Sequence, residues 1–145
     1  MNLDIDKLLA AISLRPSMSF RKGKPLFKLR PGGKKKRSGA GFVVSNAGFD
    51  QFDKQKKDAI VFLKTKKAGI RKIMNWSGVD GGELDFGVKQ RDVMVQCNSF
   101  PAELLRLAGS LALDIEFSQY PLMREKKKRK KPATARTLHN LPRRK

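Results

Sequence analysis

Two groups of lysine and arginine residues are the part of this sequence with the clearest capacity for chemistry, because such side chains bind phosphate. Residues 124–145 contain 11 Lys or Arg and one acid, Glu125, which gives this segment a net charge of +10. Between Lys7 and Phe49 there are 11 further basic residues and no acid. A protein surface normally mixes charges of both signs. The two groups therefore predict a polyanionic partner, of which nucleic acid is the commonest.

The mix of basic residues predicts contact with the nucleic-acid backbone. The chain has more Lys than Arg, and Lys supplies a hydrated point charge where Arg supplies the fork that reads guanine. Affinity should then fall steeply with salt. Phe20, Phe27 and Phe42 lie among the basic residues and are either core aromatics or stacking partners for unpaired bases. The candidate nucleic-acid-binding residues are Arg21, Lys22, Lys34, Lys35, Lys36, Arg37, Lys56, Lys57, Lys64, Lys67, Lys126, Lys127, Lys128, Arg129, Lys130 and Lys131.

Residues 124–145 form a basic tail that should be disordered in isolation, since only Leu138 and Leu141 offer it aliphatic surface. A solubilising tail without a specific partner is the alternative interpretation. Residues 126–131 also match a basic nuclear-import signal in type, as the cluster 34–37 does more weakly. The tail lacks the amphipathic pattern or lipidation motif of a membrane anchor, so no membrane partner is expected.

Acidic residues supply the one pattern that could support an enzyme. Carboxylates on neighbouring strands can hold Mg²⁺ against a phosphate, which is the arrangement of a nuclease. The alternation that would bring these residues together also explains them as ordinary solvent-facing acids, and that interpretation is favoured. The four candidates are Glu83, Asp85, Asp114 and Glu116.

Other catalytic patterns are weaker still. The single histidine, His139, lies in the basic tail, where nothing would hold it as a general base. Cys97 is expected to be a small buried hydrophobe at the end of a strand. The sequence has no paired cysteine motif and no phosphate-binding glycine loop. We therefore expect a non-enzymatic protein with no cofactor, no metal and no small-molecule substrate.

Hydrophobic periodicity predicts the elements that would position these residues. A helix should begin at Asp4 or Asp6 and end before Pro16, and a positively charged loop should span 30–39. Apolar alternation at 83–89 and again at 92–97 indicates either a hairpin turn or a bulge at 90–91, and the hairpin is favoured. The remaining elements expected are a ragged hairpin or extended segment at 19–30, a strand at 41–45, a helix over 50–76 capped by Asp50 and broken at Gly69, a helix capped by Ser99 and running through Gly109, and a strand at 111–117.

These elements predict an α+β fold with a mainly antiparallel sheet and helices packed on one face, followed by the disordered basic C-terminal tail. Residues 1–123 would form one small domain with its basic loop at 30–39, and 124–145 the tail. Within the domain, residues 80–116 contain seven acids and three bases. We expect the acids to lie on one side and a lysine-rich face on the other.

Cys97 is the only cysteine, so no internal disulfide is possible, which is typical of a reducing compartment. The first residues do not resemble a secretory signal, and no segment approaches 18 consecutive apolar residues. A cytoplasmic location is expected, or a nuclear one if the source is eukaryotic.

Residues 100–121, together with 12–16 and Gly23, resemble the closing and opening segments of an uncharacterised family of small bacterial α+β domains. The resemblance spans 12–121, and some members of that family are immunity proteins that accompany toxins. It implies an α+β fold, and as a function it implies a protein-binding inhibitor or immunity module that docks an acidic effector. The basic loop and tail are departures from the family pattern.

The sequence thus leads to two hypotheses. The first is a nucleic-acid-binding protein, with RNA slightly favoured over DNA, that works within a ribonucleoprotein or as a phage or mobile-element factor. The second is the inhibitor or immunity module, whose partner would be an acidic protein.

Overall fold

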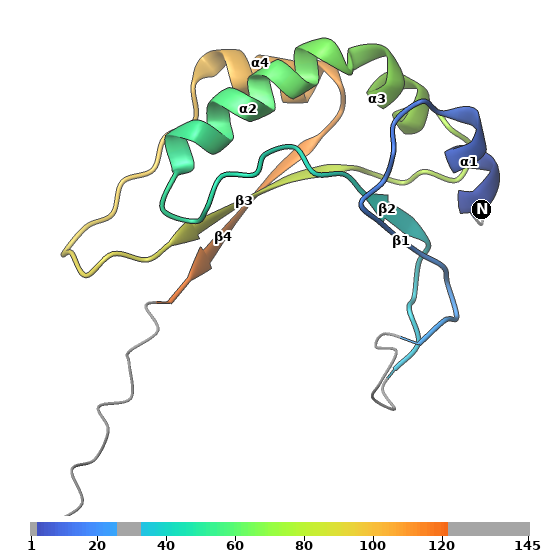
Figure 1. Cartoon of the computed structure of the whole chain (residues 1–145), viewed down its shortest axis with the longest axis horizontal. Coiled ribbons are helices and arrows are strands. Elements are labelled where there is room, and N and C mark those ends of the chain that lie inside the picture. The colour runs from blue at the N-terminus through green and yellow to red at the C-terminus, as the bar shows by residue number, and fades with distance from the viewer. Residues whose placement is uncertain (1–2, 26–32, 122–145) are drawn as a thin grey trace, which may run out of the picture.

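A computed structural model describes residues 3–25 and 33–121 of the chain. These residues form an α+β fold, as predicted, with four helices and four strands among them (Figure 1). In chain order the elements are α1 (Ile5–Ala11), β1 (Met18–Phe20), β2 (Gly39–Gly41), α2 (Phe52–Thr65), α3 (Lys67–Met74), β3 (Glu83–Lys89), α4 (Ala102–Ser110) and β4 (Asp114–Tyr120). The predicted basic tail, residues 30–32 of the predicted loop and residues 26–29 of the predicted extended segment lie outside the described residues.

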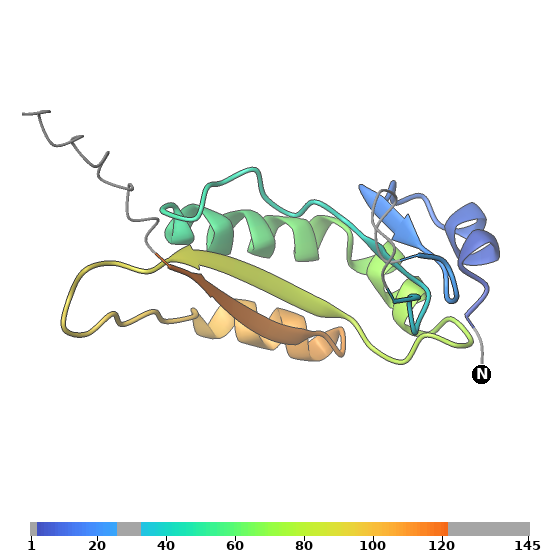
Figure 2. The same ribbon diagram turned by 90° about the horizontal axis from the view of Figure 1, so that it is seen from below.

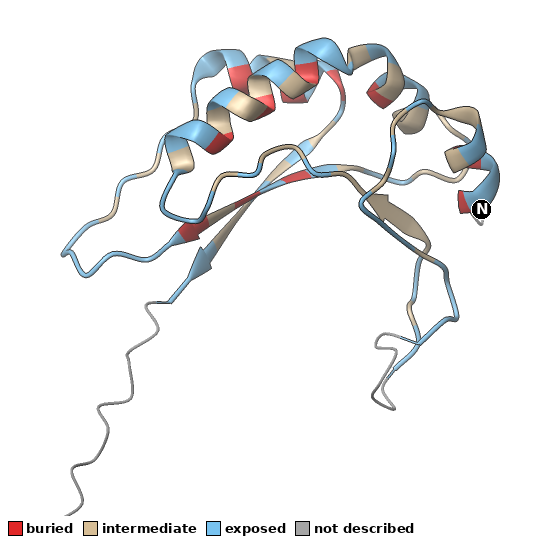
Figure 3. Ribbon diagram, in the orientation of Figure 1, coloured by how far each residue is buried: buried red, intermediate tan, exposed pale blue. Residues whose placement is uncertain are grey.

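The largest packed unit is a pair of strands covered by two helices on one face. β3 and β4 run parallel, and α2 and α4 pack on them and on each other (Figures 1 and 2). Along β3, Leu84, Phe86 and Val88 are buried while the residues between them are exposed or half-buried. Buried positions line the side of each helix that faces the strands (Figure 3). None of the four described helices covers the opposite face of this sheet.

Aromatic and aliphatic side chains fill the layer between helices and sheet. Leu63 of α2 and Leu104 of α4 are its largest fully buried side chains. Phe86 and Phe100 meet edge to face with their ring centroids 5.1 Å apart, and Phe52 lies edge to face with both. Such edge-to-face contacts add stability beyond the apolar area that they bury.

α1, β1 and β2 form a smaller unit beside α3. Asp4 caps α1 as predicted, because its carboxylate accepts a hydrogen bond from the Lys7 backbone N–H at 3.1 Å. β1 and β2 pair antiparallel, with Ser19 opposite Ala40. Lys72 of α3 donates to the Ala11 carbonyl at 2.6 Å, which joins α1 to the helical layer.

The predicted hairpin at 83–97 is wrong. The segment 92–97 forms no strand, and β3 instead pairs in parallel with β4, with Phe86 opposite Phe117. The sheet is therefore not mainly antiparallel, since antiparallel strand pairing occurs in the described part of the chain only between β1 and β2, with one isolated bridge beyond them. Parallel strands need a long crossover. Residues 90–113, which include α4, supply it and bury Leu104 against the sheet.

Several boundaries also differ from the prediction. The strand expected at 41–45 is displaced to β2, and the one expected at 111–117 begins only at Asp114. Leu111 is instead the buried C-cap of α4, and Ala112 turns the chain with a φ of 54°. The long helix breaks at Lys66, while Gly69 lies inside α3. The N-caps of α2 and α4 are Gln51 and Pro101 in place of Asp50 and Ser99.

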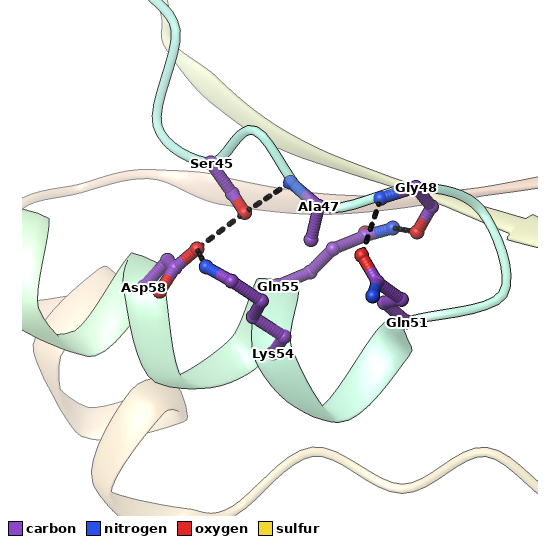
Figure 4. A network of polar contacts seen from close by, with 7 residues as sticks. All are labelled: Ser45, Ala47, Gly48, Gln51, Lys54, Gln55 and Asp58. Carbon is purple, nitrogen blue, oxygen red and sulfur yellow. Dashed lines mark hydrogen bonds and ion pairs between the residues drawn. The ribbon is translucent and has the colours of Figure 1, made fainter.

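A buried amide connects α2 to the sheet edge (Figure 4). Gln55 is the buried polar residue of the described core, and its side-chain nitrogen donates to the carbonyls of Gly48 at 2.9 Å and Gly87 at 2.8 Å. On the exposed side of the same network, Asp58 accepts from Ser45 and Lys54, both at 2.6 Å. The Lys54 ammonium, and then the Ser45 hydroxyl, lower the pKa of Asp58.

Replacing Gln55 with Met is expected to destabilise the protein by about 1–3 kcal/mol, because the carbonyls of Gly48 and Gly87 would lose the donor that the buried Gln55 amide supplies. Urea unfolding followed by circular dichroism measures this change. Gln119→Met, at an exposed position of β4, is the matched control and should change stability by less than about 0.5 kcal/mol. Equal effects from the two variants would show that the Gln55 hydrogen bonds are not important for stability.

Among the described residues, no helix combines the length and the apolar character that a membrane crossing requires.

Candidate nucleic-acid interface

Residues 21–25 and 33–37 form a short paired segment that we call the basic arm. Backbone bonds join its two sides, from Gly23 N–H to the Lys35 carbonyl at 2.8 Å and from Lys35 N–H to the Lys24 carbonyl at 2.9 Å. Gly23 adopts a φ of 79°, which suits glycine in a turn. The arm projects from the β1–β2 unit away from the helices (Figure 1).

The basic arm carries seven cations and no acid within its own residues: Arg21, Lys22, Lys24, Lys34, Lys35, Lys36 and Arg37. Arg21 forms a two-pronged ion pair with Asp6, one prong of which is a 3.0 Å bond from Nε to Oδ2. Hydrogen bonding to Arg21 lowers the pKa of Asp6. Arg37 lies 3.6 Å from Asp80 in a pair exposed to solvent, and such pairs contribute little stability.

Lys34, Lys35 and Lys36 of the arm have surroundings different from those of its two arginines. The Lys35 ammonium lies 4.3 Å from the centre of the Phe20 ring. This contact orients the ammonium without neutralising its charge. Lys34 and Lys36 are exposed and form no ion pair with any described acid. Along an extended backbone these two side chains lie about 7 Å apart.

The predicted lysines of α2 and α3 have varied surroundings. Lys57 is exposed and unpaired within the described residues, Lys64 pairs with Glu103, and Lys67 is half-buried. Lys56 is different, because its side chain is only 14% exposed. Its ammonium lies 2.8 Å from Asp53, donates to the Ser99 carbonyl at 3.0 Å, and sits 4.4 Å from the Phe52 ring centre. Lys56 therefore ties the 90–101 segment to α2 and is not available to a phosphate.

The described basic residues do not form one continuous face. Figure 1 shows α2 along the upper side of the molecule and the basic arm projecting from the lower side. The six predicted residues of 126–131 lie outside the described residues. Of the predicted set, the structure brings together Arg21, Lys22, Lys34, Lys35, Lys36 and Arg37.

The four candidate carboxylates do lie on one face of the sheet. Register places Glu83 beside Asp114 and Asp85 beside Glu116, all on the side away from the helices. Ser118 donates to Asp85 at 2.8 Å. Within residues 3–25 and 33–121, however, no three acidic, His or Cys side chains are grouped so that they could hold a metal ion. The arrangement is a negatively charged sheet face.

Cys97 is exposed, so the prediction of a buried cysteine is wrong. Its segment, 92–97, lies outside the sheet, and the alternation of that segment corresponds to no buried face. Met94 in the same segment is fully exposed. His139 lies outside the described residues.

An exposed aromatic pair was not predicted from the sequence. Phe49 and Tyr120 stack with ring centroids 4.3 Å apart and planes 19° from parallel. The aromatics singled out above are placed differently, since Phe20 and Phe42 are half-buried and Phe27 lies outside the described residues. Gly87, inside a strand, was the available signal, because a strand glycine often marks a close approach by another group.

Comparison with family models, with curated proteins and with solved structures found no match in any of the three. The resemblance of residues 12–121 to the family of small bacterial α+β domains therefore stays a prediction.

Proposed function

We propose that this chain is a non-enzymatic protein that binds the phosphate backbone of nucleic acid, with RNA favoured over DNA. The basic arm would be the contact made by the folded part of the chain, and the 11 cations of residues 124–145 would add to it. Salt-sensitive affinity and little base preference are the expected behaviour of such a protein.

The observation that carries this proposal is the concentration of cations on the basic arm. Seven positive charges occupy ten residues whose two sides are joined by backbone hydrogen bonds, so their mutual repulsion is not relieved by spreading apart. Arg21 pairs with Asp6 and Arg37 with Asp80, and both acids come from outside the arm. A polyanion laid along the arm would remove the remaining repulsion and release its own counterions.

The double variant Lys34→Gln, Lys36→Gln tests the proposal. Affinity for a single-stranded RNA or DNA oligonucleotide should fall about tenfold at 0.1 M salt, and the slope of log K against log salt should become shallower by about 1 to 2. Fluorescence anisotropy over a salt series measures both quantities.

Lys54→Gln, Lys64→Gln is the matched control, since it removes the same charge from lysines paired with Asp58 and Glu103. This control should change affinity less than about threefold. Equal losses from both double variants would mean that only total charge matters. Absence of binding to any polynucleotide at low salt would refute the proposal.

One observation favours a second candidate function, the protein-docking module. Val93, Met94 and Val95 are all exposed in the segment before α4, and neighbouring exposed apolar side chains are typical of protein contacts. In that case the cations would complement an acidic protein partner, and the deletion described in the Discussion separates the two functions.

A further inference from the structure

Phe49 and Tyr120 form what we call the aromatic platform, on the sheet face opposite the helices. The two residues are 51% and 43% exposed although their rings are stacked on each other. Both rings lie against Gly87, where an added Cβ atom would come within 2.7 Å of Phe49 and 3.2 Å of Tyr120. Both rings thus pack on the backbone of β3.

Backbone hydrogen bonds hold the platform in place. The Lys89 N–H donates to the Phe49 carbonyl and the Gln90 N–H to the Tyr120 carbonyl, both at 2.8 Å. The two rings come from segments far apart in the sequence and are fixed on the same end of β3. Prearranged rings lose little freedom when a further ring stacks on them.

Positive charge adjoins this end of the sheet. Lys89 lies opposite Tyr120 in the strand register and is exposed. The basic segment 124–145 begins four residues after Tyr120. The carboxylates lie at the other end of the strands, with Glu116 about 13 Å from Tyr120 along β4. Lys89 therefore supplies a cation beside the platform, where the exposed Asp50 follows Phe49 in the chain. The four carboxylates repel a phosphate from the other end of the strands.

We propose that the aromatic platform binds an unpaired base of single-stranded nucleic acid by stacking, with Lys89 beside the adjoining phosphate. This inference rests on the proposed function and adds the class of substrate, since in a duplex the base faces are stacked within the helix. Stacking tolerates any base, because every base has a π face. Duplexes would bind through the cations alone.

The double variant Phe49→Leu, Tyr120→Leu tests the inference, because leucine still covers Gly87 but cannot stack. Affinity for a 12-nucleotide oligo(U) or oligo(dT) should fall about tenfold, while affinity for a mixed-sequence duplex of the same length should change less than about twofold. Val61→Ala, at an exposed apolar position of α2, is the control and should leave both affinities unchanged.

A second measurement does not depend on any variant folding. Tyr120 is the only tyrosine of the chain, so 3-fluorotyrosine incorporated into the full-length protein labels this site alone. Its ¹⁹F signal should shift on addition of oligo(U) or oligo(dT) and should stay in place on addition of inorganic polyphosphate or the duplex.

The outcomes separate this inference from the proposed function. The inference would be overturned if the protein bound single strands while the ¹⁹F signal did not shift and the leucine double variant kept its affinity. The proposed function would then still stand. Equal shifts with polyphosphate would likewise overturn the inference, because phosphate would then account for the signal. If the chain bound none of these probes, the proposed function itself would fail.

Discussion

Deletion of residues 124–145 is expected to lower the affinity of the protein for single-stranded RNA or DNA by about a hundredfold or more at 0.1 M salt. The segment holds 11 of the 33 basic residues of the chain. If all of them contacted phosphates, the slope of log K against log salt would become shallower by about 8. If only some did, the change in slope would be proportionately smaller. Anisotropy titrations from low to high salt measure both effects.

The control for this deletion keeps the length of the segment and replaces its Lys and Arg residues with Gln. This variant should behave like the deletion, because charge and not chain length is expected to supply the affinity. The core of the described fold lies within residues 5–111, so both variants should unfold at the same urea concentration as the full chain. A deletion that leaves nucleic-acid affinity unchanged would contradict the role assigned to these cations and favour the protein-docking module.

Leu63→Ala is expected to destabilise the fold by about 2–5 kcal/mol. Leu63 is fully buried where α2 meets α4, and truncating it removes apolar contacts and leaves a cavity. Total stabilities of single domains are about 5–15 kcal/mol, so this one change is expected to remove a large part of the margin. Urea unfolding followed by circular dichroism measures the loss.

Val61→Ala provides the comparison on the same helix, two residues away and exposed to solvent. It should change stability by less than about 0.5 kcal/mol. A small effect at Leu63 would show that the layer between α2, α4 and the sheet is not the core of the protein.

The acidic sheet face constrains how a nucleic acid can lie on the molecule. Glu83, Asp85, Asp114 and Glu116 occupy the face between the region of the β1–β2 unit and the platform end of the strands (Figures 1 and 2). These side chains would repel a phosphate chain that crossed them. We therefore expect the basic arm and the aromatic platform to contact separate parts of a strand, or separate strands.

Some of this architecture follows from local sequence. The Asp4 cap involves two residues three positions apart in the sequence. The strand at 83–89 is marked by the alternation of apolar and polar residues within it. Both signals depend on residues close together in the sequence, so they can be read without knowing the tertiary structure. Composition likewise determined the excess of positive charge and its absence from 80–116. Together they were enough to predict the α+β class.

Only the tertiary structure decided what each element packs against. Residues 92–97 alternate as β3 does, but β3 pairs in parallel with β4. The crossover through α4 buries Leu104 and Ala108 and leaves residues 92–97, with Cys97, outside the sheet. The same long-range packing withdrew Lys56 from the surface and brought Phe49 onto Tyr120, 71 residues later in the chain. Periodicity identifies an apolar face, but the partner of that face depends on the free energy of the whole packed layer.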